Sequence, residues 1–482
     1  MADWLRRKSV SHTRKREGDK QLMPTLSWLH LVALGIGGVV GTGIYTLIGV
    51  GAGKAGPAVL LAFVIAGFVC ACAAFAYAEL ATLIPATGGA YTYSYVAGGE
   101  VLAWFIGWSL ILEYSLVVGT VAIGWSGYMV GFLDGLGVYL PFWLAAGYDS
   151  VDPVTGMHGL INLPAVLIVF VIAGFLLVGT RESATVNVIL VFVKIAALLV
   201  FVAVALPHFD PDNLRPFMPN GFFKTIVREG EDWVEKGVMA AAAIIFFAFY
   251  GFDTIATAAE EAKNPERDLS IGIIGSLAGC IVIYVLVGLA AVGAVPYTVF
   301  SASPEPLAFI VQELSSQTMA TVIAAAAVVA MPTVLLAFFY GQTRIFFAMG
   351  RDGLLPHGLS HVDKKRGVPV ATTIFTALVI AVLAGVARLE EIASLANAGT
   401  LAAFTAVGLC LLVLRVREPD LPRKFRVPGG WFIGLMTISG CVYLFYNLSG
   451  QTQMWFWVWN GIGIVFYFAF GFWKSKMRKV KR

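Results

Sequence analysis

Long apolar runs with few charges recur along the whole chain. A run long enough to cross the roughly 30 Å of membrane hydrocarbon predicts a spanning helix. Twelve such spans are predicted, near residues 31–50, 57–80, 101–132, 160–179, 184–207, 237–259, 269–295, 318–348, 369–388, 391–414, 430–449 and 454–473. The pattern therefore predicts an all-α membrane protein whose two ends lie on the same side.

Glycine interrupts the first of these spans. Nine glycines lie between Leu31 and Gly56, and each weakens a helix by about 1 kcal/mol relative to alanine. At membrane depth a broken helix persists only where protein, water or a ligand satisfies the freed N–H and C=O groups. We therefore expect a binding site at this break.

The sixth span carries a second interruption, where Gly251 and Asp253 follow a cluster of aromatic residues. Taken alone, Gly251 favours a simple contact between helices, because glycine is common in membrane helices. However, the first and sixth spans hold corresponding places in two groups of five, and paired broken helices are typical of transporters built from inverted repeats. Freed amides suit a carboxylate, and freed carbonyls suit a cation.

Composition and charge place the chain in a membrane and orient it. Hydrophobic residues make up 59% and charged residues 13% of the chain, whereas about a quarter of a soluble domain is charged. The side that holds the N-terminus carries 26 of the 33 Lys and Arg residues, which predicts cytoplasmic termini. We expect a multi-pass protein of the cell membrane that contacts lipids and binds no nucleic acid.

The spans and their charged flanks divide the chain into six parts. The predicted parts are a basic cytoplasmic segment (1–30), a first five-helix repeat (31–207), an extracellular loop with surface segments or short interfacial helices (208–236), a second five-helix repeat (237–414), spans 11 and 12 (415–473) and a basic cytoplasmic tail (474–482).

Motifs of enzymes and pumps are missing from the sequence. None of the six histidines lies deep within a span, the H-E-x-x-H motif is absent, and the nearest approach to a phosphate-binding loop, GVGAGKAG, lacks its spacing and hydroxyl. The five cysteines all lie in apolar runs, which indicates packing rather than disulfides or a metal site. A channel is built from pore-lining rings, whereas this chain offers two unlike broken helices. One alternative function stays open: an amino acid sensor of transporter ancestry, which would bind the amino acid without net transport.

Four strings carry a resemblance to a known family: GVVGTGIY (Gly38 to Tyr45), YAELATLIPATGGAYTYSY (Tyr77 to Tyr95), FFAFYGFDTIATAAEEAKNPERDLSIGI (Phe246 to Ile273) and GRDGLLP (Gly350 to Pro356). With them the chain resembles the amino acid–polyamine–organocation (APC) superfamily and, within it, the cationic amino acid transporter family. The resemblance implies the LeuT-like 5+5 inverted-repeat fold with 12 transmembrane helices, of which helices 1 and 6 are broken, as in bacterial members.

The resemblance also implies a substrate site. The family's G-(S/T)-G motif becomes Gly41, Thr42 and Gly43, which are expected to hold the carboxylate of an L-amino acid. The carbonyls expected to meet its ammonium group are those of Val39, Phe247, Ala248 and Tyr250. Phe247 falls where superfamily members keep an aromatic gate, and simple packing is its alternative role.

Three ionisable residues stand out inside predicted spans, where a charge is costly and usually functional: Lys194, Asp253 and Glu113. The resemblance places the Lys194 ammonium where sodium-coupled relatives bind Na⁺, so the lysine is the expected proton-coupling group. Burial disfavours its charged form; the alternative is a permanently charged lysine that bridges helices. Asp253 either moves protons or ties the broken helix to a neighbour. Glu113 reads a cationic side chain, accepts a proton, or pairs with Lys or Arg.

The residues and the resemblance together imply proton-coupled symport of L-amino acids by alternating access, with the proton as coupling ion and no cofactor. The substrate is small and neutral, cationic, or both. Met331, beside Pro332 in the eighth span, either shapes the side-chain pocket or packs, and its apolar character favours neutral or broad specificity.

Overall fold

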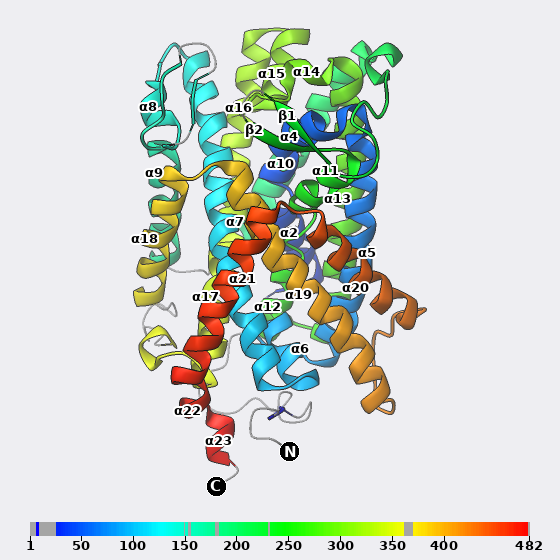
Figure 1. Ribbon diagram of the computed structural model, residues 1–482, viewed down its shortest axis with the longest axis vertical. Coiled ribbons are helices and arrows are strands. Elements are labelled where there is room, and N and C mark those ends of the chain that lie inside the picture. The colour runs from blue at the N-terminus through cyan, green and yellow to red at the C-terminus, as the bar shows by residue number, and fades with distance from the viewer. Residues whose placement is uncertain are drawn as a thin grey trace.

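Helices dominate the structure, a computed structural model that describes residues 6–8, 26–148, 150–152, 156–178, 183–229, 232–360 and 370–480. In this part of the chain nine helical segments are long and apolar enough to cross a membrane, and three further apolar helices are shorter. The chain is therefore a multi-pass membrane protein. The described residues nearest its two termini, 6–8 and Lys476–Val480, lie at the same end of the molecule, where Lys8 and Lys476 both contact Asp352 (Figure 1). Most of the predicted N-terminal segment 1–30 lies outside the described residues.

The helices follow one another as α2 (Trp28–Val39), α3 (Thr42–Tyr45), α4 (Leu47–Ala55), α5 (Val59–Leu83), α6 (Ala90–Ala97), α7 (Glu100–Gly135), α8 (Phe142–Ala145), α9 (Leu163–Val178), α10 (Ser183–Ala205), α11 (Val238–Ile245), the 3₁₀ turn η4 (Phe246–Ala248), α12 (Asp253–Thr257), α13 (Pro265–Ala294), α14 (Tyr297–Phe300), α15 (Pro306–Leu314), α16 (Gln317–Ala330), α17 (Pro332–Arg351), α18 (Val370–Val386), α19 (Leu389–Arg417), α20 (Gly430–Tyr446), α21 (Gly450–Phe466), α22 (Phe472–Lys474) and α23 (Lys476–Val480).

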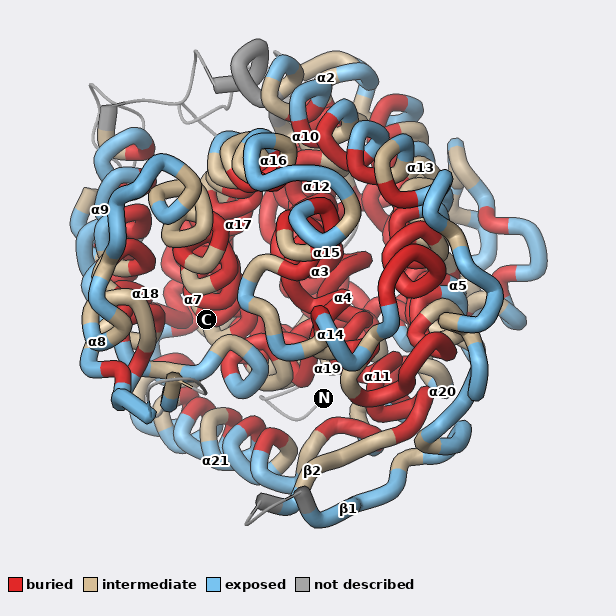
Figure 2. The backbone as a smooth tube through the Cα atoms, turned by 90° about the horizontal axis from the view of Figure 1, so that it is seen from above, coloured by how far each residue is buried: buried red, intermediate tan, exposed pale blue. Residues whose placement is uncertain are grey.

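The first and sixth spans lie at the centre of the bundle. Figure 2 shows α3, α4, α11 and α12 surrounded by other helices, whereas α9, α18, α20 and α21 expose one side at the periphery. In the most apolar stretch of Val238–Thr257, 100% of the residues are buried inside the protein, compared with 28% in that of Gly450–Lys474. The outer helices present apolar side chains to the surroundings, as lipid-facing helices do, and the inner pair is shielded from them.

Both central spans are interrupted where the sequence predicts it. In the first span, α2 ends at Val39 and α3 begins at Thr42; in the sixth, α11 passes into η4 and α12 begins only at Asp253. The eighth span is divided as well, because Pro332 lacks the N–H that would continue the helix and begins a new one after Met331.

A β-hairpin lies in the segment 208–236, for which surface segments or short helices were predicted. Strands β1 (Thr225–Glu229) and β2 (Asp232–Lys236) pair in antiparallel register, with Thr225 opposite Lys236. The prediction missed the hairpin, although the run Thr225-Ile226-Val227 has the β-branched side chains that favour strands. The hairpin lies near α4 and α11, at the end of the molecule away from the termini (Figure 1).

The largely buried carboxyl group of Glu305, between α14 and α15, packs against α7. Glu305 precedes α15, and its carboxylate lies so close to α7 that a Cβ at Gly131 would overlap it. Burial raises the pKa of Glu305 from 4.5 to about 8, and the nearby carboxylate of Asp134 adds to the shift.

Replacing this carboxyl group tests the packing. The folded protein holds the Glu305 proton more tightly than the unfolded chain does, so this contribution to stability is complete below the ordinary carboxyl pKa and is lost as pH rises through about 8. We expect the thermal midpoint of the wild type to fall between about pH 6 and about pH 9, and that of Glu305→Gln to fall less. Glu313→Gln on α15, an exposed control, should follow the wild type. Equal slopes for all three proteins would contradict the assignment.

Candidate functional site

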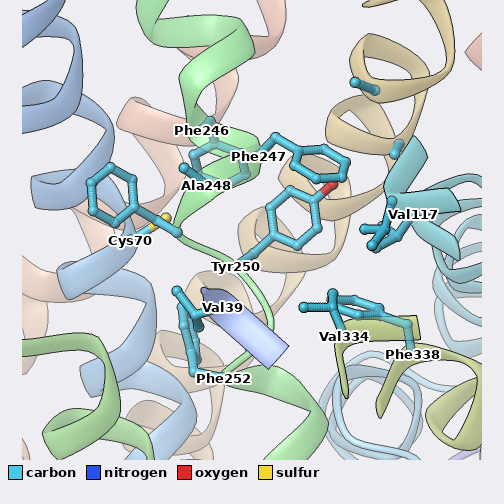
Figure 3. Packing of buried hydrophobic residues seen from close by; sticks show 14 of the residues in the cluster. Val39, Cys70, Val117, Phe246, Phe247, Ala248, Tyr250, Phe252, Val334 and Phe338 are labelled. Carbon is cyan, nitrogen blue, oxygen red and sulfur yellow. The ribbon is translucent and has the colours of Figure 1, made fainter. Parts of the chain in front are cut away.

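The two interrupted spans touch each other at glycines. A Cβ at Gly43 would overlap Ala248 Cα and would lie 2.9 Å from Ala248 N. Gly251 has a φ of 127°, and a Cβ there would lie 2.7 Å from the carbonyl carbon of Gly38. A side chain at either position would separate the two backbones, so glycine is required at both. Figure 3 shows the two segments side by side at Val39, Ala248 and Tyr250.

Backbone groups of opposite polarity are free at this contact. The N–H groups of Thr42 and Gly43 begin α3 and therefore have no partner within the helix. The Thr42 hydroxyl also has no hydrogen-bond partner among the residues that the structure describes. In the sixth span, no hydrogen bond from a described residue reaches the carbonyls of Phe247, Ala248 and Tyr250. The arrangement thus offers donors on the first span and acceptors on the sixth.

Lys194 of α10 binds the first break directly. Its Nζ donates to the carbonyl oxygens of Gly37 at 2.9 Å and Val40 at 2.8 Å, and to Thr333 Oγ1 on α17 at 2.6 Å. An ammonium group has three N–H donors, and the structure supplies three acceptors for them. The sequence predicted contacts to the first span but missed Thr333, because a hydroxyl in an apolar helix carries no distinctive signal.

Tyrosine hydroxyls hold other carbonyls of the first span. Tyr284 on α13 donates to Val39 O at 2.9 Å, and Tyr128 on α7 donates to Tyr45 O at 2.5 Å. Tyr45 in turn donates to the backbone oxygen of Lys194 at 3.2 Å. The Val39 carbonyl, predicted to meet the substrate ammonium, thus already accepts one bond and keeps its second lone pair. Sequence reasoning missed these tyrosines, which lie in ordinary apolar runs.

Asp253 ties the second break to a neighbouring helix. Tyr114 on α7 donates to Asp253 Oδ2 at 2.6 Å, and the Gly251 N–H donates to Asp253 Oδ1 at 3.1 Å. Of the two predicted roles, these contacts account for the structural tie. Proton movement through Asp253 stays a prediction.

Glu113 is a buried carboxyl group without a cationic partner. Its side chain packs against α19, where a Cβ at Gly399 would lie 2.9 Å from Glu113 Cβ. Among the described residues neither carboxylate oxygen has a hydrogen bond of ordinary geometry, and no Lys or Arg pairs with it, unlike one of the predicted alternatives. The Thr400 hydroxyl of α19 interacts with both Glu113 and Tyr250, and the remaining lone pairs of these groups can accept from a ligand.

Apolar side chains complete the surroundings. The Phe247 ring lies 5.1 Å from that of Tyr250, and the Phe338 ring of α17 lies 6.1 Å from Tyr250 on another side (Figure 3). Val334 reaches the first break, because a Cβ at Gly41 would lie 2.7 Å from Val334 Cγ2. The eighth span therefore contacts the breaks through Val334 and Phe338, which the sequence analysis did not single out.

Two predicted residues have a known place but an untested role. Met331 is completely buried at the division of the eighth span, one turn before Val334. Phe247 is 5% exposed and belongs to η4. The pocket role of Met331 and the gate role of Phe247 both stay predictions.

A helical membrane protein in which two interrupted spans meet at the centre has the architecture of a secondary transporter. The comparison of sequences agrees with this class. Residues 26–469 match the amino acid permease family, to which the chain belongs. This membership confirms the predicted relation to the APC superfamily and identifies a transporter rather than an enzyme.

Relatives named for different substrates align with most of this chain. The branched-chain amino acid permease BcaP of Bacillus subtilis is 43% identical over 449 residues, which cover 93% of both proteins. The methylthioribose transporter of the same organism is 38% identical over 457 residues, covering 95% of both. The vacuolar cationic amino acid transporter 4 of Arabidopsis thaliana is 36% identical over 426 residues, covering 87% of this chain and 68% of the relative.

A substitution at the closest contact tests the site. Gly43→Val should abolish amino acid binding, because its Cβ cannot fit beside Ala248. Gly279→Val on α13 is the matched control, since a Cβ there meets nothing within 4 Å. Binding is measured by thermal stabilisation of the purified protein with leucine, lysine and alanine. Wild-type-like binding by Gly43→Val would contradict the assigned site.

Proposed function

We propose that this chain is a secondary active transporter that moves L-amino acids together with protons by alternating access. The observation that carries the proposal is the meeting of two interrupted spans, one presenting N–H groups and the other carbonyls, with Lys194 bound to the first. A zwitterion has the complementary pair of charges. The names of two relatives, a branched-chain amino acid permease and a cationic amino acid transporter, support an amino acid as substrate.

Substrate recognition follows from the free backbone groups. The amides of Gly41, Thr42 and Gly43, with the Thr42 hydroxyl, bind the α-carboxylate as an anion at a helix start. The α-ammonium binds the carbonyls of the sixth span, with the second lone pair of Val39 O as a further acceptor. Because these contacts use only main-chain groups and one hydroxyl, they leave the substrate side chain to the surrounding helices.

Coupling to protons follows from the bond count at Lys194. The ammonium form can satisfy Gly37 O, Val40 O and Thr333 Oγ1 at once, whereas a neutral amine has only two N–H donors. Loss of the proton therefore removes one of the bonds that hold α2 to α10 and α17. In the proposed cycle, protonation of Lys194 fixes the first break, and deprotonation lets α2 move.

The proposed architecture is the LeuT-like fold with twelve spans. The nine long apolar segments and the three shorter apolar helices α9, α18 and α20 together supply that number. In this arrangement spans 1–5 and 6–10 form the two inverted repeats, and α2 and α11 point toward opposite sides of the membrane. The excess of Lys and Arg on the side of the termini supports a cytoplasmic location of both ends in a cell membrane.

Aliphatic neutral amino acids are the proposed substrate class. The side chains around the breaks are largely apolar, as Val334, Phe338 and Phe247 illustrate. One observation favours cationic amino acids as a second candidate: the buried carboxyl group of Glu113 has no cationic partner among the described residues. A lysine or arginine substrate would supply that partner.

Uptake into proteoliposomes tests coupling and substrate together. With pH and sodium gradients imposed separately, we expect accumulation of leucine driven by the pH gradient alone. Lys194→Ala should lose this accumulation, because the variant has no side chain at this position whose protonation changes the hydrogen bonds to α2. Lys54→Ala removes a second buried lysine that pairs with Glu390 at 2.7 Å, and this control should keep the response to the pH gradient.

Each outcome decides one part of the proposal. Unchanged accumulation by Lys194→Ala would remove the lysine from the mechanism, and accumulation driven only by sodium would contradict proton coupling. Faster uptake of lysine than of leucine would favour the cationic substrate class. Substrate binding without uptake would identify a sensor instead of a transporter.

A further inference from the structure

A buried asparagine holds the sixth span much as Lys194 holds the first. Asn397 lies in α19 and is completely buried. Its Nδ2 donates to Ala243 O at 2.8 Å and to Ile244 O at 3.2 Å. Both carbonyls belong to the last turn of α11, just before the helix tightens into η4. They are among the last four carbonyls of the helix, which lack the regular partner of a helix interior, although Ile244 O also accepts a bond from the Phe246 N–H.

The side chain makes no other polar contact in the described part of the chain. Asn397 Oδ1 is buried and has no hydrogen-bond partner. Both hydrogen bonds of this amide therefore go to the end of α11, which indicates that Asn397 holds that end in position.

The two capping contacts have matching positions in the chain. Lys194 lies on α10, the fifth predicted span, and binds carbonyls where α2 ends. Asn397 lies on α19, the tenth predicted span, and binds carbonyls where α11 ends. Each interrupted span is thus capped, at the end of its first half, by a buried donor from the helix that closes its own group of five.

The two donors differ in one chemical respect. An ammonium group can lose a proton and with it a hydrogen bond, whereas an amide keeps both N–H donors at any physiological pH. We propose that Asn397 is a positioning residue that fixes α11 independently of pH, so that protons control only the first of the two interrupted helices. The inference rests on the proposed function, because it assigns the response to protons to one side of the transport cycle.

Other titratable groups lie on the elements around Asn397, and they are present in the wild type and in every Asn397 variant alike. On α7, Glu113 packs against Gly399, two residues further along α19. Near η4, Tyr250 interacts with Thr400 of α19, and Asp253 begins α12. Effects of these groups on pH dependence are shared with the wild type, so the ratio of variant to wild-type affinity removes them.

Replacing the amide by an acid converts the constant cap into a titratable one. In Asn397→Asp the neutral carboxyl can still donate to one carbonyl, whereas the ionised form has no donor and repels both. We expect the full-length purified Asn397→Asp variant to bind leucine about as tightly as the wild type near pH 5. Near pH 8 its affinity should be roughly tenfold weaker than that of the wild type, an effect of the size that the loss of a buried hydrogen bond produces. Asn397→Leu, which lacks a donor at any pH, should be weaker by a constant factor.

A control variant accompanies the test, and its outcomes distinguish failure of the positioning role from failure of the proposed function. Asn447→Asp alters another buried asparagine that donates to a backbone carbonyl, Tyr443 O at 2.8 Å, at the far end of α20; its affinity ratio should not change with pH. If Asn397→Asp shows a ratio independent of pH while the wild type binds leucine, the positioning role is overturned and the proposed function stands. If the wild type binds no amino acid at any pH, the proposed function itself fails.

Discussion

Unpaired peptide groups are costly in a membrane, and the structure depends on how those at its two helix breaks are satisfied. Hydrocarbon supplies no hydrogen bonds, so an interrupted helix survives only inside protein that provides them. Here the first and sixth spans lie at the buried centre of the bundle (Figure 2). Side chains from surrounding helices reach the carbonyls that the breaks expose, among them Lys194, Tyr284 and Asn397. The groups left over are those that a zwitterion can use.

Close approach of the two backbones gives this arrangement its specificity. Gly43 and Gly251 bring peptide groups of the two spans into direct contact, where a methyl group would not fit. In the proposed site, main-chain groups fixed in this way bind the part that all amino acids share. Variation between amino acid substrates then requires changes only in the flanking side chains, which agrees with relatives named for branched-chain amino acids and for cationic amino acids.

Local properties of the sequence predicted the breaks and the lysine. Glycine content weakens a helix wherever it occurs, and a charge within an apolar run such as Lys194 is conspicuous because it is expensive there. The partners of these groups could not be predicted. Thr333, Tyr284 and Asn397 are polar residues that apolar helices tolerate, and their acceptor carbonyls are set by how distant helices pack. The hairpin β1–β2 was missed for a related reason, since its strands are short and pair only in the folded loop.

The central claim is that the free backbone groups of the two breaks bind the amino acid. An experimentally determined density map of the protein in a lipid nanodisc with bound leucine tests it most directly. The account predicts the α-carboxylate within hydrogen-bonding distance of the Thr42 and Gly43 amides, and the α-ammonium at the carbonyls of Phe247, Ala248 or Tyr250. Leucine bound elsewhere, or first and sixth spans that run as unbroken helices through the membrane, would contradict it.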